Sequence, residues 1–209
     1  MEIKRATFIT SLSSYGNYQG MGLPEIAIAG KSNVGKSSMI NKICTRQRLA
    51  KVSGTPGKTK LLNVFRINDD FHLVDLPGYG FAKVSKAERE RWGHMMQGYF
   101  ENSALLCHVL HLVDIRHDPS ADDLNMNAFL RETGIPFTVI ATKADKVSRA
   151  QRARHVHQVC RCLQVQPWEV IPFSSEDGTG KEQTLSLFTD VCTAFQEAEQ
   201  ENVLPPMDR

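Results

Sequence analysis

The stretch that decides the fold of this chain is Gly30-Lys31-Ser32-Asn33-Val34-Gly35-Lys36-Ser37. It matches the pattern G-x-x-x-x-G-K-[ST], in which the glycines let the backbone curl around phosphate groups. An apolar run at residues 25–29 precedes it, and residues 38–44 place Met39, Ile40 and Ile43 on one helical face. A strand, a glycine-rich loop and a helix in this order predict a binding site for a nucleoside triphosphate.

Two side chains of this loop and one later motif have expected roles around the phosphates. We expect Lys36 to reach the β- and γ-phosphates, and the Ser37 hydroxyl to ligate Mg²⁺, which prefers hard oxygen ligands. The motif Asp75-Leu76-Pro77-Gly78 ends a predicted strand at residues 71–75. We expect Asp75 to hold the same Mg²⁺ through water and the Gly78 amide to contact the γ-phosphate.

A second motif indicates which base is bound. Thr142-Lys143-Ala144-Asp145 follows an apolar strand and resembles the guanine-recognition pattern [NT]-K-x-D. Asp145 can accept two hydrogen bonds from guanine, from its ring N–H and its amine, whereas adenine offers neither donor there. Lys143 can lay its aliphatic stem along the base. Ser174-Ser175-Glu176, at another strand end, fits the loop whose backbone N–H contacts the guanine oxygen in such proteins.

The polar loop between Thr45 and Lys60 is long for a compact domain, which favours a functional segment. It should supply one hydroxyl to Mg²⁺ when GTP is bound, and Thr55 and Thr59 are the candidates. We favour Thr59 because it stands directly before the next strand. Lys36, Thr59 and Gly78 are then the candidate catalytic residues. The segment expected to become ordered with GTP and to relax after hydrolysis is Gly57-Lys58-Thr59-Lys60-Leu61.

Strand and helix patterns alternate along the chain, which predicts a doubly wound α/β fold with ligand loops at the carboxyl ends of the strands. We expect a mostly parallel six-stranded sheet with helices on both faces and one antiparallel strand, from a hairpin over residues 61–75. Predicted helices cover residues 85–100, 120–131, 148–163 and 181–199. The division is an N-terminal arm (1–22), a GTP-binding domain (23–200) and a frayed tail (201–209).

Composition bounds the class of protein. With 209 residues, 41% of them hydrophobic, 23% charged and a net charge of +2, the chain suits one globular domain. Five cysteines, an odd number, favour reduced thiols in the cytoplasm, and Cys160-Arg-Cys162 lacks the spacing of a zinc site. No apolar stretch reaches the roughly 20 residues that span a bilayer. We therefore expect a cytoplasmic monomer without membrane contact.

Two segments concentrate positive charge without any acidic residue. The first holds Arg46, Arg48, Lys51, Lys58, Lys60 and Arg66, and the second holds Arg149, Arg152, Arg154, His155, His157 and Arg161. Such segments favour binding to a nucleic-acid phosphate backbone, although the second could be an ordinary solvated helix face. On that helix we expect the apolar side to be Ala153, Val156, Cys160 and Leu163. We also expect that replacing Arg149 and Arg152 leaves GTP affinity intact.

Four motifs together carry a family resemblance: GKSNVGKSS, TPGKTK, DLPGYGFA and TKAD. The set closely resembles the EngB/YihA/YsxC family of bacterial ribosome-assembly GTPases, within the group that contains Era, EngA and the septins. The resemblance implies hydrolysis of GTP to GDP and a switch role in assembly of the large ribosomal subunit. It also implies binding to large-subunit precursors and ribosomal RNA, and a need for the protein in normal growth and division septation.

Two residues bear on how hydrolysis would proceed. Tyr79 stands where Ras-like enzymes carry a Gln that orients the attacking water, so intrinsic hydrolysis should be slow. The missing group would come from a partner or from a bound cation. Asn33 matches an asparagine that helps to bind K⁺ in related potassium-activated GTPases, which makes it a candidate K⁺ ligand. A low-turnover GTP-binding scaffold is the main alternative, and a P-loop small-molecule kinase is disfavoured by the guanine motif.

Overall fold

The structure is a computed structural model that describes residues 1–15, 20–46, 48–50, 61–80 and 86–203. Its main described elements, in chain order, are β1 (Ala6–Leu12), β2 (Glu25–Gly30), α1 (Lys36–Ile43), β3 (Leu62–Ile67), β4 (Phe71–Asp75), α2 (Lys86–Asn102), β5 (Leu106–Asp114), α3 (Ala121–Thr133), β6 (Phe137–Thr142), α4 (Arg149–Leu163), β7 (Val170–Pro172) and α5 (Lys181–Val203).

The described strands form one sheet in the order β1-β3-β4-β2-β5-β6-β7. From β4 to β7 each neighbouring pair is parallel, whereas β3 runs antiparallel to both β1 and β4. The prediction of a mostly parallel sheet with one antiparallel strand is therefore confirmed. The crossovers place the carboxyl ends of β2, β4, β5, β6 and β7 at one edge, where ligand loops of this fold class gather.

The predicted strand count of six is wrong for the described sheet, which has seven strands. The additional strand is β1, in the segment expected to be a turn-rich arm. It pairs with β3 from Ala6 opposite Ile67 to Leu12 opposite Leu62. Because β1 lies at the sheet edge, most of its residues are not buried, and the sequence lacks the apolar alternation that marks a half-buried strand.

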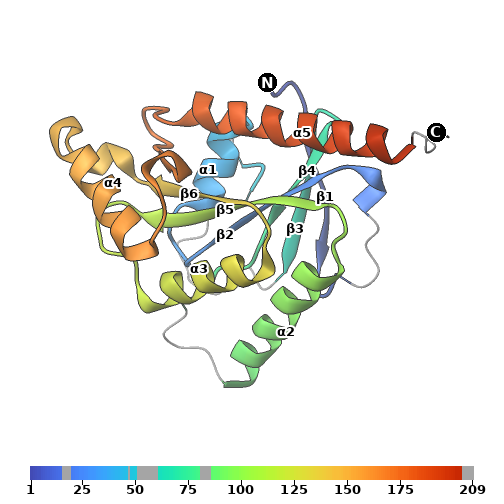
Figure 1. The fold of residues 1–209 in the computed structure, drawn as a ribbon, viewed down its shortest axis with the longest axis horizontal. Helices are drawn as coiled ribbons and strands as arrows, with labels where there is room; N and C mark the ends of the chain where they lie inside the picture. The colour runs from blue at the N-terminus through green and yellow to red at the C-terminus, as the bar shows by residue number, and fades with distance from the viewer. Residues whose placement is uncertain (16–19, 47, 51–60, 81–85, 204–209) are drawn as a thin grey trace, which may run out of the picture.

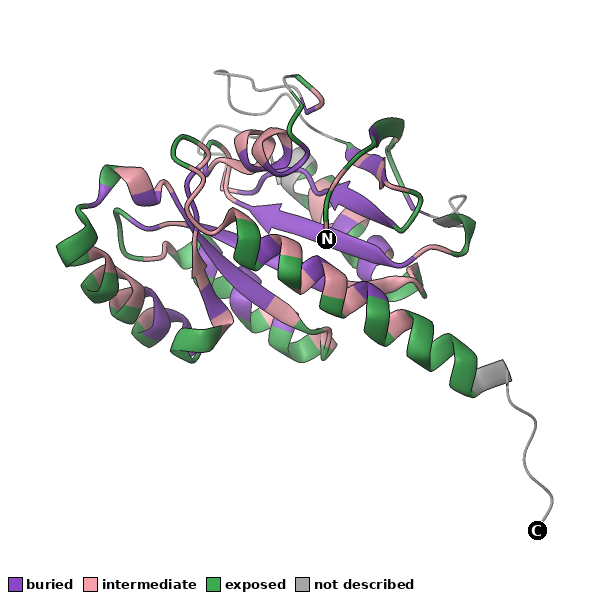
Figure 2. Ribbon diagram, turned by 90° about the horizontal axis from the view of Figure 1, so that it is seen from above, coloured by how far each residue is buried: buried purple, intermediate pink, exposed green. Residues whose placement is uncertain are grey.

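Helices cover both faces of the sheet (Figure 1), as the doubly wound prediction required. On one face, α1 and α5 pack against side chains such as Ile26 and Ile28 of β2. On the other face, α2 and α3 pack around Ala27 and Ala29 of the same strand, and α4 packs farther along against β6. Figure 2 shows the central strands β2, β4, β5 and β6 largely buried between these layers.

Two helices show how far the sequence pattern located the core. On α2, which lies within the predicted helix over residues 85–100 apart from its last turn, Met96 and Tyr99 are buried and Trp92 and Met95 are partly buried against them. Ser85, the first residue of the helix predicted over residues 85–100, lies outside the described residues. On α4, Val159, Cys160 and Leu163 are buried, and the predicted core position Ala153 is exposed.

Candidate functional site

The phosphate-binding loop connects β2 to α1, as the sequence predicted. Gly35 has φ +117°, a conformation that L side chains rarely adopt, and it directly precedes the first helical residue, Lys36. A side chain at Gly30 would lie 2.9 Å from Val34 and 3.0 Å from Leu112, so the loop packs closely against β5. The α1 N-terminus thus faces the hollow of the loop with its first N–H groups unbonded within the helix.

The loop after β4 lies directly on the phosphate-binding loop. The Ser32 N–H donates to the Tyr79 carbonyl oxygen over 3.0 Å, and Lys31 and Tyr79 form an isolated β-bridge. A Cβ at Gly78 would lie 2.9 Å from Ser32 Oγ and 3.2 Å from Lys36 Nζ. The same Cβ would lie 3.1 Å from the Ser32 backbone nitrogen, so a side chain at position 78 would crowd the phosphate-binding loop, and Gly78 lies close to Lys36.

Asp75 ends β4 and is only 4% exposed. Burial raises the pKa of this carboxyl, while the charge of Lys36 and a hydrogen bond with Asn63 lower it. Asn63 lies opposite Asp75 on β3, and its Oδ1 accepts from the Ser11 hydroxyl of β1 over 2.7 Å. The edge strand that the sequence did not predict therefore helps to orient the carboxylate.

Asp75 Oδ1 has no hydrogen-bond partner among the described residues, although it is buried. An unpaired carboxylate oxygen in such a place suits a site for a hydrated cation. The Ser37 hydroxyl, in the first turn of α1, offers a second hard oxygen. These two residues fit the predicted Mg²⁺ set. The third member, Thr59, lies outside the described residues, as do Thr55, Gly57, Lys58 and Lys60. Leu61, the last residue of that predicted segment, is exposed and directly precedes β3.

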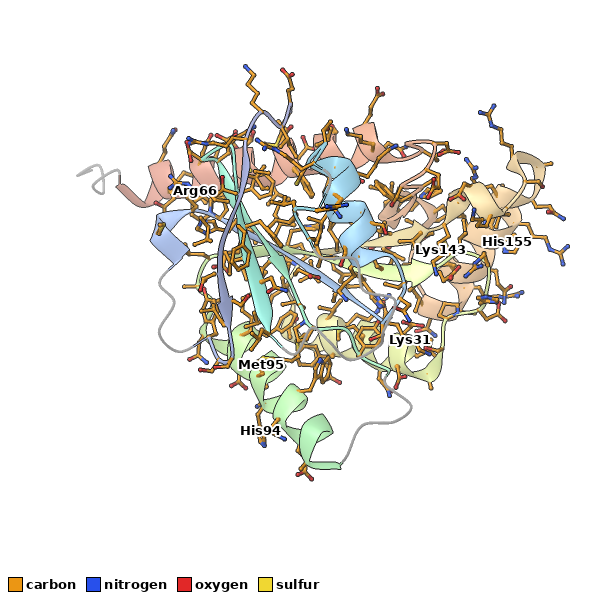
Figure 3. All side chains as sticks on the ribbon, turned by 180° about the vertical axis from the view of Figure 1, so that it is seen from behind. Lys31, Arg66, His94, Met95, Lys143 and His155 are labelled. Carbon is orange, nitrogen blue, oxygen red and sulfur yellow. The ribbon has the colours of Figure 1, made fainter. Side chains whose placement is uncertain are left out.

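The guanine motif is bonded to the phosphate-binding loop. Thr142 Oγ1 lies 2.7 Å from the Val34 carbonyl oxygen and 3.0 Å from that of Val113. Lys143 has φ +61°, and its Nζ donates to the Asn33 carbonyl oxygen over 2.9 Å. Figure 3 shows Lys143 and Lys31 at the same side of the molecule, far from Arg66. The structure thus brings the two predicted motifs into direct contact.

A carboxylate that sequence reasoning missed holds Lys143 in place. Asp114, the last residue of β5, lies 2.9 Å from Lys143 Nζ and accepts two hydrogen bonds from the Arg116 guanidinium, over 2.9 and 2.8 Å. Burial raises the pKa of Asp114, but bonds from Arg116 and Lys143 outweigh it and hold the pKa well below its usual range. Its position at a strand's carboxyl end was the available signal.

Asp145 is fixed by the loop that follows β7. Its Oδ1 accepts from the Ser174 hydroxyl over 2.9 Å, and its Oδ2 lies 3.0 Å from Lys146 Nζ. Burial works against ionisation, but these two partners lower the pKa of Asp145, so the carboxylate is charged at neutral pH. The Ser174 N–H donates to Thr179 and the Glu176 N–H to Ser174 Oγ. The backbone N–H groups of Ser174 and Glu176 are therefore already bonded within this loop.

Tyr79 points away from the phosphate-binding loop into a buried polar cluster. Its hydroxyl donates to Asp123 Oδ1 over 2.8 Å and lies 2.9 Å from His111 Nε2. Asp123 Oδ2 accepts from both the backbone N–H and the hydroxyl of Ser120. A hydroxyl has one hydrogen, which Asp123 takes, so His111 carries its own hydrogen on Nε2 and donates. Burial lowers the pKa of His111 to about 4, which agrees with this neutral form. We call Tyr79, His111 and Asp123 the buried triad. The triad links His111, in the middle of β5, to the loop after β4.

In the two predicted basic segments, the structure shows which positively charged side chains face solvent and which bind other parts of the protein. Arg66 lies 2.8 Å from the Asp69 carboxylate, and Lys51, Lys58 and Lys60 lie outside the described residues. On α4, Arg149, Arg154, His157 and Arg161 are exposed, and Figure 3 shows the half-buried His155 on the same helix. Arg152 turns inward instead, and its Nη2 donates to the Ala144 carbonyl oxygen over 2.9 Å. The expectation that Arg152 belongs to a solvent-facing surface is therefore wrong.

Within the described part of the chain, no helix combines the length and the apolar character needed to cross a bilayer. All five cysteines lie in the described residues and are unpaired.

Comparison with known proteins agrees with the site geometry. The family model described as "50S ribosome-binding GTPase" matches residues 25–143. A protein of Heliobacterium modesticaldum named "Probable GTP-binding protein EngB" is 47% identical over 206 residues, covering 98% of this chain and 100% of that protein. A crystal structure of a probable GTP-binding protein engB superposes with a TM-score of 0.67 at 24% identity, over 81% of this chain and 99% of that chain. Era in complex with MgGDPNP and nucleotides 1506–1542 of 16S ribosomal RNA superposes with a TM-score of 0.62 at 20% identity, over 81% of this chain and 56% of that chain.

Proposed function

We propose, from the premise that this chain belongs to the EngB family of P-loop GTPases, that GTP and GDP bind at the carboxyl edge of its sheet and that GTP is hydrolysed there. The observation that carries the proposal is the direct bonding of the guanine motif to the phosphate-binding loop. Thr142 lies 2.7 Å from the Val34 carbonyl oxygen, and Lys143 lies 2.9 Å from that of Asn33. These hydrogen bonds hold the residues proposed to contact the base at a fixed distance from those proposed to contact the phosphates.

The residues around the phosphates divide the work by their chemistry. The remaining N–H groups of the phosphate-binding loop and of the α1 N-terminus bind phosphate oxygens, and Lys36 balances the charge of the β- and γ-phosphates. Ser37 and Asp75 would hold Mg²⁺, with Thr59 as the further proposed ligand. When bound, Mg²⁺ neutralises the charge that develops on the phosphates during transfer. The Gly78 N–H would contact the γ-phosphate, and the loop after β4 would in this way distinguish GTP from GDP.

Asp145 provides the proposed choice of guanine. Xanthine carries a carbonyl where guanine carries its amine, so an amide side chain suits xanthine and a carboxylate suits guanine. We expect Asp145→Asn to weaken GDP binding by about 100-fold and to strengthen XDP binding. Unchanged affinities for both nucleotides, measured by calorimetry, would count against the proposed guanine site.

Hydrolysis by the chain alone should be slow. The Tyr79 side chain is turned into the buried triad, so it does not face the position of an attacking water. The group that orients water would then come from a ribosomal partner or from K⁺ near Asn33. Equal GTPase rates in K⁺ and Na⁺ buffers, with ribosomal particles present, would remove the K⁺ proposal.

The same Tyr79 geometry supports the second candidate, a low-turnover scaffold, which predicts no acceleration by large-subunit precursors.

The proposed cellular role is a GTP-dependent switch in assembly of the large ribosomal subunit, with effects on growth and division septation. The name of the matching family and the rRNA bound to Era in its structure support a ribosomal partner. The exposed cations of α4 (Arg149, Arg154, His157 and Arg161) supply a surface suited to RNA phosphates. The unpaired cysteines favour action in the cytoplasm.

Sedimentation of the protein with ribosomal particles tests this role. We expect co-sedimentation with large-subunit precursors in GTP and release in GDP. Replacing the exposed Arg149 and Arg154 with glutamate should weaken particle binding and leave GTP affinity unchanged, because neither side chain joins the nucleotide site. Nucleotide-independent sedimentation would contradict the switch, and loss of GTP affinity in this variant would contradict separate surfaces.

A further inference from the structure

We propose that Arg152 of α4 is a positioning residue for guanine recognition, because its guanidinium ties together the two loops that fix the Asp145 carboxylate. The inference rests on the proposed guanine site and extends it to a helix outside the nucleotide motifs. The sequence pattern places Arg152 in the second basic segment, read either as a nucleic-acid surface or as a solvated helix face. The structure brings it instead to the backbone of the guanine motif.

The first contact is with the residue that precedes Asp145. Arg152 Nη2 donates to the Ala144 carbonyl oxygen over 2.9 Å, and Ala144 is completely buried. The Ala144 N–H donates to the Phe173 carbonyl oxygen over 3.0 Å. The peptide that carries Asp145 is therefore held from α4 on one side and from the end of β7 on the other. A charged donor makes the stronger kind of hydrogen bond to a carbonyl.

The second contact is with the loop that holds the carboxylate itself. Arg152 Nη1 lies 3.5 Å from Thr179 Oγ1, and the Thr179 carbonyl oxygen accepts from the Ser174 N–H over 3.0 Å. Ser174 Oγ in turn donates to Asp145 Oδ1. One planar guanidinium thus reaches both sides of the Asp145 support, which a lysine ammonium at the end of a flexible stem cannot reproduce.

The position of Arg152 on its helix accounts for this inward direction. Arg152, Val156, Val159 and Cys160 are spaced as i, i+4, i+7 and i+8, which is the face that α4 turns toward the sheet. Arg152 Nε is buried and has no hydrogen-bond partner among the described residues. Burying that group costs stability. A side chain whose only role was to hold α4 in place would gain more from an apolar residue at this position.

The matched control is Arg131 of α3, which makes the same kind of bond far from the guanine motif. Its Nη2 donates to the carbonyl oxygens of Leu163 and Gln164, at the C-terminal end of α4, over 3.3 and 2.6 Å. Like Arg152→Ala, Arg131→Ala therefore removes a guanidinium that donates to backbone carbonyl oxygens, here at the C-terminal end of α4. It should lower thermal stability without changing the choice between nucleotides.

The test compares GDP with IDP, whose base lacks the exocyclic amine and loses one hydrogen bond to Asp145. Dissociation constants are measured by calorimetry for the full chain and its variants Arg152→Ala, Arg152→Lys and Arg131→Ala. We expect Arg152→Ala to weaken GDP binding by about 10-fold and IDP binding less, so that the GDP preference shrinks. The GDP preference of Arg152→Lys, which keeps the charge and one hydrogen bond, should lie between that of Arg152→Ala and that of the parent chain. Arg152→Lys provides the test if Arg152→Ala does not fold.

Asp145→Asn distinguishes a failure of the proposed role of Arg152 from a failure of the proposed guanine site. If it abolishes the GDP preference while both Arg152 variants keep that of the parent chain, the guanine site stands and the role of Arg152 is overturned. If Asp145→Asn leaves the preference unchanged, the proposed guanine site itself fails. A preference reduced equally by Arg131→Ala would show a general loss of stability and would also overturn the assignment of Arg152.

Discussion

Replacing Tyr79 with phenylalanine removes a single hydroxyl from the buried triad. The ring is 6% exposed and keeps its edge contact with Trp92, so the change acts on hydrogen bonds more than on packing. It leaves Asp123 Oδ1 and His111 Nε2 without their shared partner. Unpaired buried groups cost about 1–3 kcal/mol, and Asp123 keeps its two bonds from Ser120. We therefore expect a loss of about 2 kcal/mol, which lowers Tm by about 4–8 °C in a chain of this length.

The functional effect should appear in the affinity for GTP. The Tyr79 carbonyl oxygen accepts from Ser32, and Gly78 beside it is the proposed γ-phosphate contact. Freeing the Tyr79 side chain lets this segment move. The movement should weaken binding of GTP, which has the γ-phosphate, more than binding of GDP. We expect the ratio of GTP to GDP affinity to fall about fivefold, which corresponds to about 1 kcal/mol.

Tyr99→Phe is the matched control, because it makes the same chemical change at the other end of the sheet. The Tyr99 hydroxyl donates to Glu25 Oε2 over 2.9 Å, and Glu25 is the first residue of β2, at the end opposite Gly30. Urea unfolding and nucleotide titrations of both variants should show similar losses of stability, with the GTP-to-GDP ratio changed only in Tyr79→Phe. Identical ratios in the two variants would refute the argument that the triad positions the loop after β4.

Burial lowers the pKa values of His108 and His111 to about 4 from 6.5, so below pH 6.5 the unfolded chain binds protons that the folded chain does not. Stability should fall as the pH drops from 6.5 to about 4, by up to about 1.4 kcal/mol per pH unit for each histidine, and urea unfolding at several pH values checks this; stability that stays constant or rises would contradict it. Asp75→Asn removes a buried charge with an unpaired oxygen, so it should fold at least as stably as the parent chain while nucleotide binding loses its dependence on Mg²⁺; a dependence that survives would remove Asp75 from the metal site. Thr142→Val removes the contacts with Val34 and Val113 and should weaken GDP binding by about 10-fold, whereas Thr142→Asn, with its own donor, should restore most of it; full affinity in Thr142→Val would show that the joint between motifs is dispensable.

Much of the fold followed from local sequence signals. The phosphate-binding loop, the strand at residues 71–75 and the helix beginning at Lys181 lie where their patterns placed them. These elements combine a characteristic motif or turn with apolar residues at strand or helix spacing. The strand β1 lacked such a pattern because an edge strand of mostly exposed residues has no buried face to reveal it.

The site shows a similar division between local motifs and long-range contacts. Motif positions came from the sequence, but their supports lie far along the chain: Asp114 beside Lys143, Asp123 beside Tyr79 and Arg152 beside Ala144. No local spacing links these pairs. On α4 the predicted apolar face includes Ala153, whereas in the structure Arg152 lies on that face. Consecutive residues are about 100° apart around a helix, so the prediction is wrong by one residue. That one-residue difference separates a solvent-facing cation from one that is partly buried against the guanine motif.

Titration calorimetry of the full chain with GDP, GTP and ATP, each in the presence of Mg²⁺, tests the central claim most directly. The account predicts that both guanine nucleotides bind at a single site and that ATP binds at least about 100-fold more weakly, because Asp145 finds no donors on adenine. ATP affinity equal to that of GTP, or the absence of binding heat with either guanine nucleotide, would contradict it.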